Sequence, residues 1–104
     1  MADPAAARGE TTVAVLNGTT TNGLAAQLAE RLTSAGYQQG PRGNFADQQR
    51  ATSVVLYREG AADRARDVAS LLYVSDVQPI DAQTEAQPIG DAQVVVVAGH
   101  DQAP

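Results

Sequence analysis

Apolar residues are concentrated in three short, β-branched runs along the chain, which are Thr11–Leu16, Thr52–Tyr57 and Val94–Ala98. Segments this short, rich in Val and Thr and bounded by turn residues, are typical of β-strands. The near-continuous apolarity of Thr11–Leu16 indicates burial on both faces of a sheet. Val94–Ala98 is the most hydrophobic segment, and we expect it to be a central strand.

A helical period follows the first of these runs. Leucines recur at every fourth position of the segment Asn22–Ala35, namely Leu24, Leu28 and Leu32. This spacing places them on one face of an α-helix. We expect Thr21 or Asn22 to cap the first turn through a side-chain oxygen, and Gly36 to supply the left-handed residue at the helix end.

A second helical period runs from Ala61 to Leu72. Its buried face is predicted to consist of small and aliphatic side chains, Ala61, Ala65, Val68, Ala69 and Leu72. Asp63 lies near the predicted start, where a carboxylate interacts favourably with the helix dipole. Asp63 and Arg66 are spaced to form an ion pair on the helix surface.

The remaining segments carry weaker signals. Tyr37–Gln39 is predicted to be a short strand, followed by a long polar loop over Gly40–Arg50. Val77–Ile80 is predicted to be a short strand, and Pro79 restricts it to a sheet edge because proline cannot donate to a neighbouring strand. Asp81–Gly90 is predicted to be a polar loop.

The predicted order of elements is β-α-β-β-α-β-β, which places the chain in the α/β (α+β) class. Strands that alternate with helices favour some parallel pairing. Because two helices cannot cover both faces of a wide sheet, we expect a two-layer sandwich. Its mixed four- to five-stranded sheet would carry both helices on one face, ferredoxin-like in general architecture.

The length of 104 residues is that of one domain. Residues 1–10 are small, polar and aperiodic, and we expect them to form a disordered leader or a linker remnant. Residues 102–104 are expected to form a flexible tail, which leaves residues 11–101 as the folded domain. Such ends suggest a module of a longer protein.

Composition excludes several classes of function. The formal net charge is −5, and all seven basic residues are arginines without a basic stripe, so we expect no nucleic-acid partner. The chain has no cysteine, which excludes a disulfide scaffold, a zinc-thiolate site and a thiol nucleophile. No apolar run is long enough to span a bilayer, so direct membrane insertion is not expected.

No constellation of catalytic residues is apparent. The single histidine, His100, precedes Asp101, but none of the four serines lies in a G-x-S-x-G motif. The acidic residues are scattered rather than paired or clustered with histidine, which favours neither glycoside hydrolysis nor metal binding. The sequence therefore predicts no enzyme, no metal site and no cofactor.

The loop after the first strand is the best candidate for a ligand site. It leads into a helix N-terminus, where free backbone N–H groups favour an anion. If the first and last strands are parallel, the residues after the last strand lie at the same end of the sheet. The candidates are Asn17, Gly18, Thr19, Thr20, Thr21, Asn22 and Gly23 with Gly99, His100 and Asp101. The loop lacks the Walker spacing, and a well-capped turn without a ligand is the alternative.

Three segments together resemble the LytR C-terminal domain family. VAVLNGTTTNGLAAQLAERLTSAGY, from Val13 to Tyr37, is similar to the family's strand, L-N-G, G-L-A helix and G-[FY] sequence. TSVVLYREGAADRARDVASLL fits its T-x-V-x-Y strand and Ala-rich helix, and DAQVVVVAGHD fits its A-D-V-V-V-x-L-G-x-D close. The chain departs at Gln38–Gln39, where the family has a valine-rich strand, and at Ala98, where it has leucine.

The resemblance implies a cellular context. Such domains usually lie C-terminal to a LytR-CpsA-Psr phosphotransferase domain on a membrane-anchored protein that faces the cell wall, mainly in Gram-positive bacteria, including actinobacteria. The neighbouring domain attaches glycopolymers to peptidoglycan. Its arginine- and aspartate-lined pocket has no counterpart here, and the family supplies no catalytic residue to transfer.

Two functions follow as hypotheses. The first is a non-catalytic accessory module that binds cell-wall glycan, peptidoglycan or the adjoining LytR-CpsA-Psr catalytic domain, on the extracytoplasmic side of the membrane. The alternative is a structural or oligomerisation domain that orients the catalytic domain, using an exposed strand edge to bind a partner.

Overall fold

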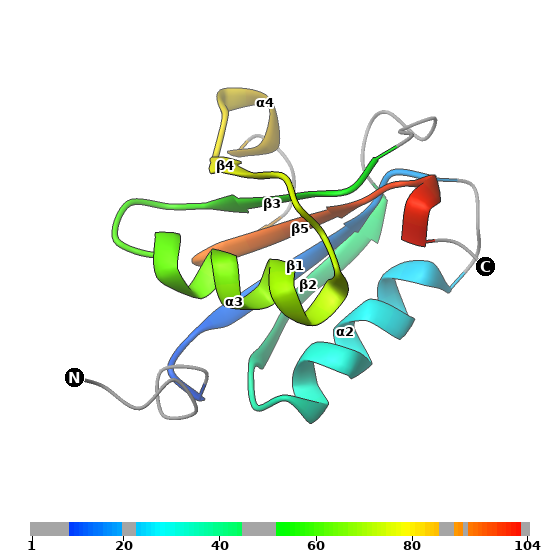
Figure 1. Cartoon of the computed structure of the whole chain (residues 1–104), viewed down its shortest axis with the longest axis horizontal. Helices are drawn as coiled ribbons and strands as arrows, with labels where there is room; N and C mark the ends of the chain where they lie inside the picture. The colour runs from blue at the N-terminus through cyan, green and yellow to red at the C-terminus, as the bar shows by residue number, and fades with distance from the viewer. Residues whose placement is uncertain (1–8, 20–22, 45–51, 86–88, 91, 103–104) are drawn as a thin grey trace.

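Figure 1 shows the computed structural model, which describes residues 9–19, 23–44, 52–85, 89–90 and 92–102. The strands are β1 Thr12–Asn17, β2 Gln38–Asn44, β3 Val54–Tyr57, β4 Val77–Pro79 and β5 Val94–Ala98. The helices are α2 Leu24–Ser34, α3 Ala62–Leu72 and the short α4 Ala82–Glu85, and a 3₁₀ turn, η1, covers His100–Gln102. These bounds confirm the three apolar strands and both helices to within two residues.

The five strands form one mixed sheet in the order β2-β1-β5-β3-β4. β1 is parallel to β2 and β5, β3 is parallel to β4, and β3 and β5 are antiparallel. The central place of β5 and the edge position of β4 are confirmed. The strand order also shows that β1 and β2 are direct neighbours. In a split β-α-β unit, another strand lies between the two strands that the helix connects.

The hydrophobic core lies on both faces of the central strands. Along β1 and β5, alternate side chains belong to two separate clusters, because successive residues of a strand point to opposite faces. Val15 and Val96 pack on one face, and Leu16 and Val97 on the other, all with at most 1% of their surface exposed. The continuous apolar runs are therefore explained by burial on two sides.

Both helices cover the same face of the sheet (Figure 1). Leu24, Leu28 and Leu32 of α2 join one cluster with Val68 and Leu72 of α3. α2 packs on β1 and β2, and α3 packs on β3 and β4. The predicted two-layer arrangement of helices and mixed sheet is confirmed.

Three described residues from the chain between β4 and β5 lie on the opposite face. Ile89 and Ala92 are buried against this face, with Ile80 partly buried beside them. The prediction of a polar loop over Asp81–Gly90 is wrong in part, because α4 begins there. The Thr84 backbone N–H donates to Asp81 Oδ1 at 2.7 Å, which caps this short helix.

β2 is longer than the sequence predicts. The polar loop expected from Gly40 is wrong at its start, because the strand continues to Asn44. The pairing with β1 shifts register between Val13 and Val15, because the two residues Gly40 and Pro41 lie opposite the single residue Ala14. A Cβ on Gly40 would lie 2.9 Å from Thr12 Cγ2 and 3.0 Å from the Val13 carbonyl oxygen, so the close approach requires glycine.

Glycines lie at both ends of α2. Its N-cap is Gly23, which adopts a left-handed conformation with φ 82° and offers no side-chain cap. Thr21 and Asn22, the predicted caps, lie outside the described residues. Gly36 follows the C-cap with φ 111°, as a glycine at this place allows. The C-cap of α3 is Tyr73, a non-glycine residue with φ 58°.

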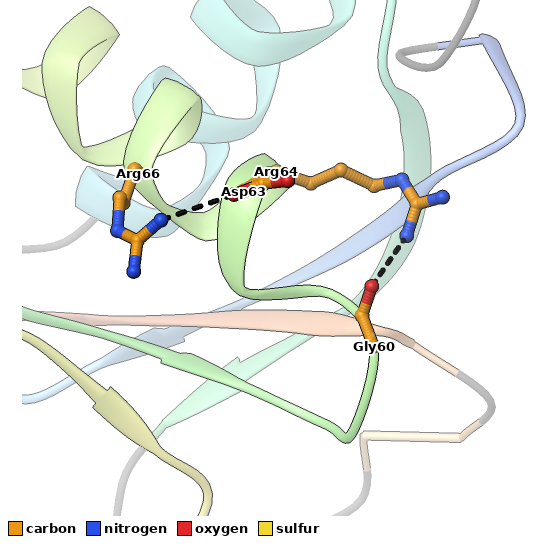
Figure 2. Close-up of polar contacts among 4 residues, drawn as sticks. All are labelled: Gly60, Asp63, Arg64 and Arg66. Atoms are coloured by element: carbon orange, nitrogen blue, oxygen red, sulfur yellow. Dashed lines mark hydrogen bonds and ion pairs between the residues drawn. The ribbon is translucent and has the colours of Figure 1, made fainter. Parts of the chain in front are cut away.

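Charged residues mark the solvent face of α3. In Figure 2, dashed lines join Arg66 to Asp63 and Arg64 to Gly60. Arg66 Nη1 lies 3.0 Å from Asp63 Oδ1, which confirms the predicted pair, and Arg64 Nη1 donates to the Gly60 carbonyl at 3.3 Å. The side chains of the pair are 69% and 97% exposed, so the pair contributes little to stability. Asp67 differs from them, because it accepts a hydrogen bond from the Tyr37 hydroxyl.

Candidate functional site

The turn after β1 is organised by the last residue of the strand. Asn17 Oδ1 accepts hydrogen bonds from the Thr19 backbone N–H at 2.9 Å and the Thr19 hydroxyl at 2.7 Å. The Gly18 N–H donates to the Ala98 carbonyl at 2.8 Å, which ties the turn to β5. Asn17 and Thr19 are buried, so this part of the turn is well fixed. Thr20, Thr21 and Asn22 lie outside the described residues.

An open depression of about 310 Å³ lies where β1 and β2 end and α2 begins. It is lined by residues from all three elements, Asn17, Gly23, Ala25, Ala26, Arg42 and Gly43. Two of the predicted site residues, Asn17 and Gly23, therefore come together here. Ala25 and Ala26, which contribute the start of α2 to this lining, are half-buried.

The depression favours a negatively charged group. The first N–H groups of an α-helix have no partner within the helix, and the helix dipole is positive at this end. The first turn of α2 contains no acidic residue that would neutralise it. Arg42, which is exposed on β2 opposite Val15, adds a guanidinium group to the same lining.

Gly99, His100 and Asp101 lie at the same end of the sheet, because β1 and β5 are parallel as expected. They do not line the depression. Both carboxylate oxygens of Asp101 accept from the Ser53 N–H at 3.1 Å, and Oδ1 also accepts from the Ser53 hydroxyl at 2.6 Å. In turn, the Gly99 N–H donates to Ser53 Oγ at 2.8 Å. This Ser53–Asp101 link joins the end of β5 to the start of β3.

Gly99 allows this link to form. A Cβ at this position would lie 2.5 Å from the carbonyl carbon of Thr52 and 2.8 Å from the nitrogen of Ser53. Only glycine therefore fits between β5 and the incoming chain. The side chain of His100 is exposed in η1. Gly99 and Asp101 thus have structural contacts that the sequence did not predict.

Two residues of this region were not selected from the sequence. Arg42 falls in the stretch expected to be a loop, where no periodic pattern indicated its neighbours. Ser53 lies in a strand run, and its pairing with Asp101 spans 48 positions. The signals that could have found them are an arginine between Pro41 and Gly43, and a serine directly before a buried strand that faces the G-x-D sequence.

The described residues contain neither a cluster of metal ligands nor a helix that could span a membrane. Within them, no group of three or more His, Cys, Asp and Glu residues could hold a metal ion. None of the helices in the described part of the chain is both long and apolar enough to cross a membrane. The Ser53 hydroxyl donates directly to Asp101, without a histidine between them.

Two solved structures resemble this fold. The solution structure of the C-terminal domain of RV0431 is 30% identical in sequence, with a TM-score of 0.57, and the match covers 86% of this chain and 71% of that chain. The crystal structure of a soluble domain of a conserved hypothetical secreted protein from Mycobacterium marinum, an Rv2700 ortholog, is 25% identical with a TM-score of 0.60. That match covers 90% of this chain but only 62% of the other.

A search of the curated proteins finds no match to the chain. The sequence does match the model of one family, LytR_C, described as LytR cell envelope-related transcriptional attenuator, over residues 10–101. This range contains β1 to β5, both long helices and the depression. The chain therefore belongs to the LytR_C family.

Proposed function

We propose that this LytR_C domain is a non-catalytic accessory module of a cell-envelope protein, and that it binds cell-wall glycan or peptidoglycan through an anionic group. Family membership supports the envelope context. The observation that carries the binding proposal is the depression formed by Arg42 and the start of α2. We further propose that the domain lies on the extracytoplasmic side, as part of a membrane-anchored protein.

The chemistry of the depression suits a carboxylate or a phosphate. An arginine guanidinium binds such groups through two parallel hydrogen bonds, and the free N–H groups of a helix start can add others. Peptidoglycan fragments carry carboxylates, and many wall glycopolymers carry phosphate. With a net charge of −5 over the chain, we expect attraction to be local to Arg42 rather than spread over the surface.

A calorimetric titration of the 104-residue chain with soluble peptidoglycan fragments tests this function. We expect Arg42→Ala to weaken binding by roughly tenfold or more, because a hydrogen bond to a charged group contributes about 1.5–3 kcal/mol. Arg66→Ala is the matched control, because Arg66 is exposed on α3 and pairs only with Asp63 among the described residues. Equal affinities of the two variants would contradict the proposed site.

An adjoining LytR-CpsA-Psr catalytic domain is the alternative partner for the same module, with a strand edge as its contact. β2 and β4 are the two edges of the sheet, which favours this alternative. Pro41 and Pro79 lie in these strands and each removes an N–H donor, which weakens strand addition. Sedimentation of the chain alone and with that domain separates the two functions: self-association or complex formation without glycan binding would favour the alternative.

A further inference from the structure

Tyr73 projects into solvent from the end of α3. Its side chain is 91% exposed, and it is the one large hydrophobic residue with such exposure among the described residues. Its backbone is left-handed, with φ 58° and ψ 37°, at the C-cap of α3. Glycine adopts this conformation without strain, whereas a tyrosine does not.

The neighbouring residues hold the backbone of Tyr73 in place while the ring stays in solvent. The Tyr73 N–H donates to the Ser70 carbonyl at 3.3 Å, and the Val74 N–H donates to the Ala69 carbonyl at 2.8 Å. Val74 is the residue whose side chain turns into the core, with 8% of its surface exposed. The helix end therefore fixes the Tyr73 backbone and presents its ring on the surface.

The surroundings of the ring in the chain are polar and uncharged or acidic. Ser70 and Ser75 are exposed, and Gln78 Nε2 donates to Asp76 Oδ1 at 2.8 Å. A protein interface usually needs a contiguous apolar core with several large side chains. A single aromatic ring bordered by hydroxyl and amide groups instead matches a sugar, which has an apolar ring face and a polar rim.

The ring and the depression also lie toward the same end of the molecule. α2 begins after the C-terminal end of β1, and α3 ends just before β4. β4 starts beside the beginning of β3, where Val55 pairs with Val77, and β3 is antiparallel to β5. The end of α3 and the start of α2 therefore lie at the same end of the sheet, on the same face (Figure 1).

We propose that Tyr73 stacks against the pyranose ring of a glycan whose anionic group occupies the depression. This assignment rests on the proposed function, and it adds the chemical class of the second contact, a neutral sugar ring rather than another charged group. Asp76 and the negative end of the α3 dipole exclude an anion near the ring. The exposed polar side chains of Ser70, Ser75 and Gln78 lie close to Tyr73 in the sequence, where they would form hydrogen bonds with the sugar hydroxyls.

The test compares Tyr73→Ala, Tyr73→Gly and Tyr73→Phe in the 104-residue chain. The probes are a neutral N-acetylglucosamine tetrasaccharide and a soluble disaccharide-peptide from peptidoglycan, followed by calorimetry and amide chemical shifts. We expect Tyr73→Ala and Tyr73→Gly to weaken binding of both probes roughly fivefold or more, and Tyr73→Phe to retain it within about twofold. Tyr73→Gly relieves the left-handed strain, so loss of its binding does not reflect misfolding.

The other outcomes separate this inference from the proposed function. Binding that is weakened by Arg42→Ala and unchanged by Tyr73→Ala overturns the stacking role and leaves the proposed function standing. Binding that depends on Tyr73 and not on Arg42 supports the stacking role and overturns the depression. No binding of either probe overturns both. A change in self-association or in binding of a protein partner upon Tyr73→Ala, with unchanged saccharide affinity, assigns the ring to a protein contact instead.

Discussion

Asp101 and Ser53 show how single residues connect distant parts of the chain. The carboxylate of Asp101 accepts three hydrogen bonds from Ser53, and Gly99 donates to the same serine hydroxyl. The sequence indicated Gly99 and Asp101 as candidate site residues, because they follow the last strand at the end of the sheet that also carries the loop after the first strand. It could not indicate their partner, because a pairing across 48 positions leaves no local pattern.

The first residue-scale prediction concerns this link. We expect Asp101→Ala to lower the free energy of unfolding by about 1–3 kcal/mol, because the Ser53 N–H and hydroxyl lose their acceptor. Denaturant unfolding followed by circular dichroism measures the change. Asp63→Ala is the control, since Asp63 belongs to an exposed pair worth less than about 1 kcal/mol. A loss for Asp101→Ala no larger than that of the control would contradict the structural role of the link.

A second prediction concerns the strained end of α3. Tyr73→Gly is expected to raise the free energy of unfolding by about 1 kcal/mol, because glycine adopts the left-handed conformation at φ 58° without steric conflict. In a domain of this size the midpoint of thermal unfolding would rise by about 4–8 °C. Tyr73→Ala keeps the strain and is expected to remain near the wild-type midpoint. A lower midpoint for the glycine variant would mean that the exposed ring stabilises the fold.

At the scale of elements, the strength of the local pattern decided what the sequence could predict. β1 and β5 have continuous apolar runs, α2 and α3 have periodic apolar residues, and the positions of all four follow from the sequence. β2 has neither: its sequence, QQGPRGN, forms a strand because β1 offers a parallel partner along its open side. Arg42 was missed for the same reason, and with it the part of the depression that β2 lines.

The register shift between β1 and β2 provides a prediction at this scale. Gly40→Ala is expected to destabilise the fold by about 1–3 kcal/mol, since the added Cβ meets Thr12 Cγ2 at 2.9 Å and backbone at 3.0 Å. Gly43→Ala, three residues later in the same strand, meets only Leu16 Cδ2 at 3.9 Å and is expected to be neutral or slightly stabilising. Chemical denaturation of both variants gives the comparison. Equal losses would place the close approach elsewhere in β2.

For the whole molecule, the sheet order determines which predicted residues meet. Because β1, β2 and β5 are parallel, their ends bring the loop after β1 and the residues after β5 to one end. The sequence predicted this end correctly. It did not predict that Asn17 and Gly23 would share a depression with Arg42, while Gly99 and Asp101 would join β3. The ligand role of the latter group stays a prediction.

The central question for this domain is whether the depression binds an anionic wall fragment. The most direct measurement is a two-dimensional amide NMR titration of the chain with soluble peptidoglycan fragments, repeated with Arg42→Ala. We predict saturable shifts that cluster at Gly18, at the start of α2 and at Arg42 and Gly43, and that are lost in the variant. Saturating binding with shifts confined to other surfaces, or no saturable shift at all, would contradict the proposed site.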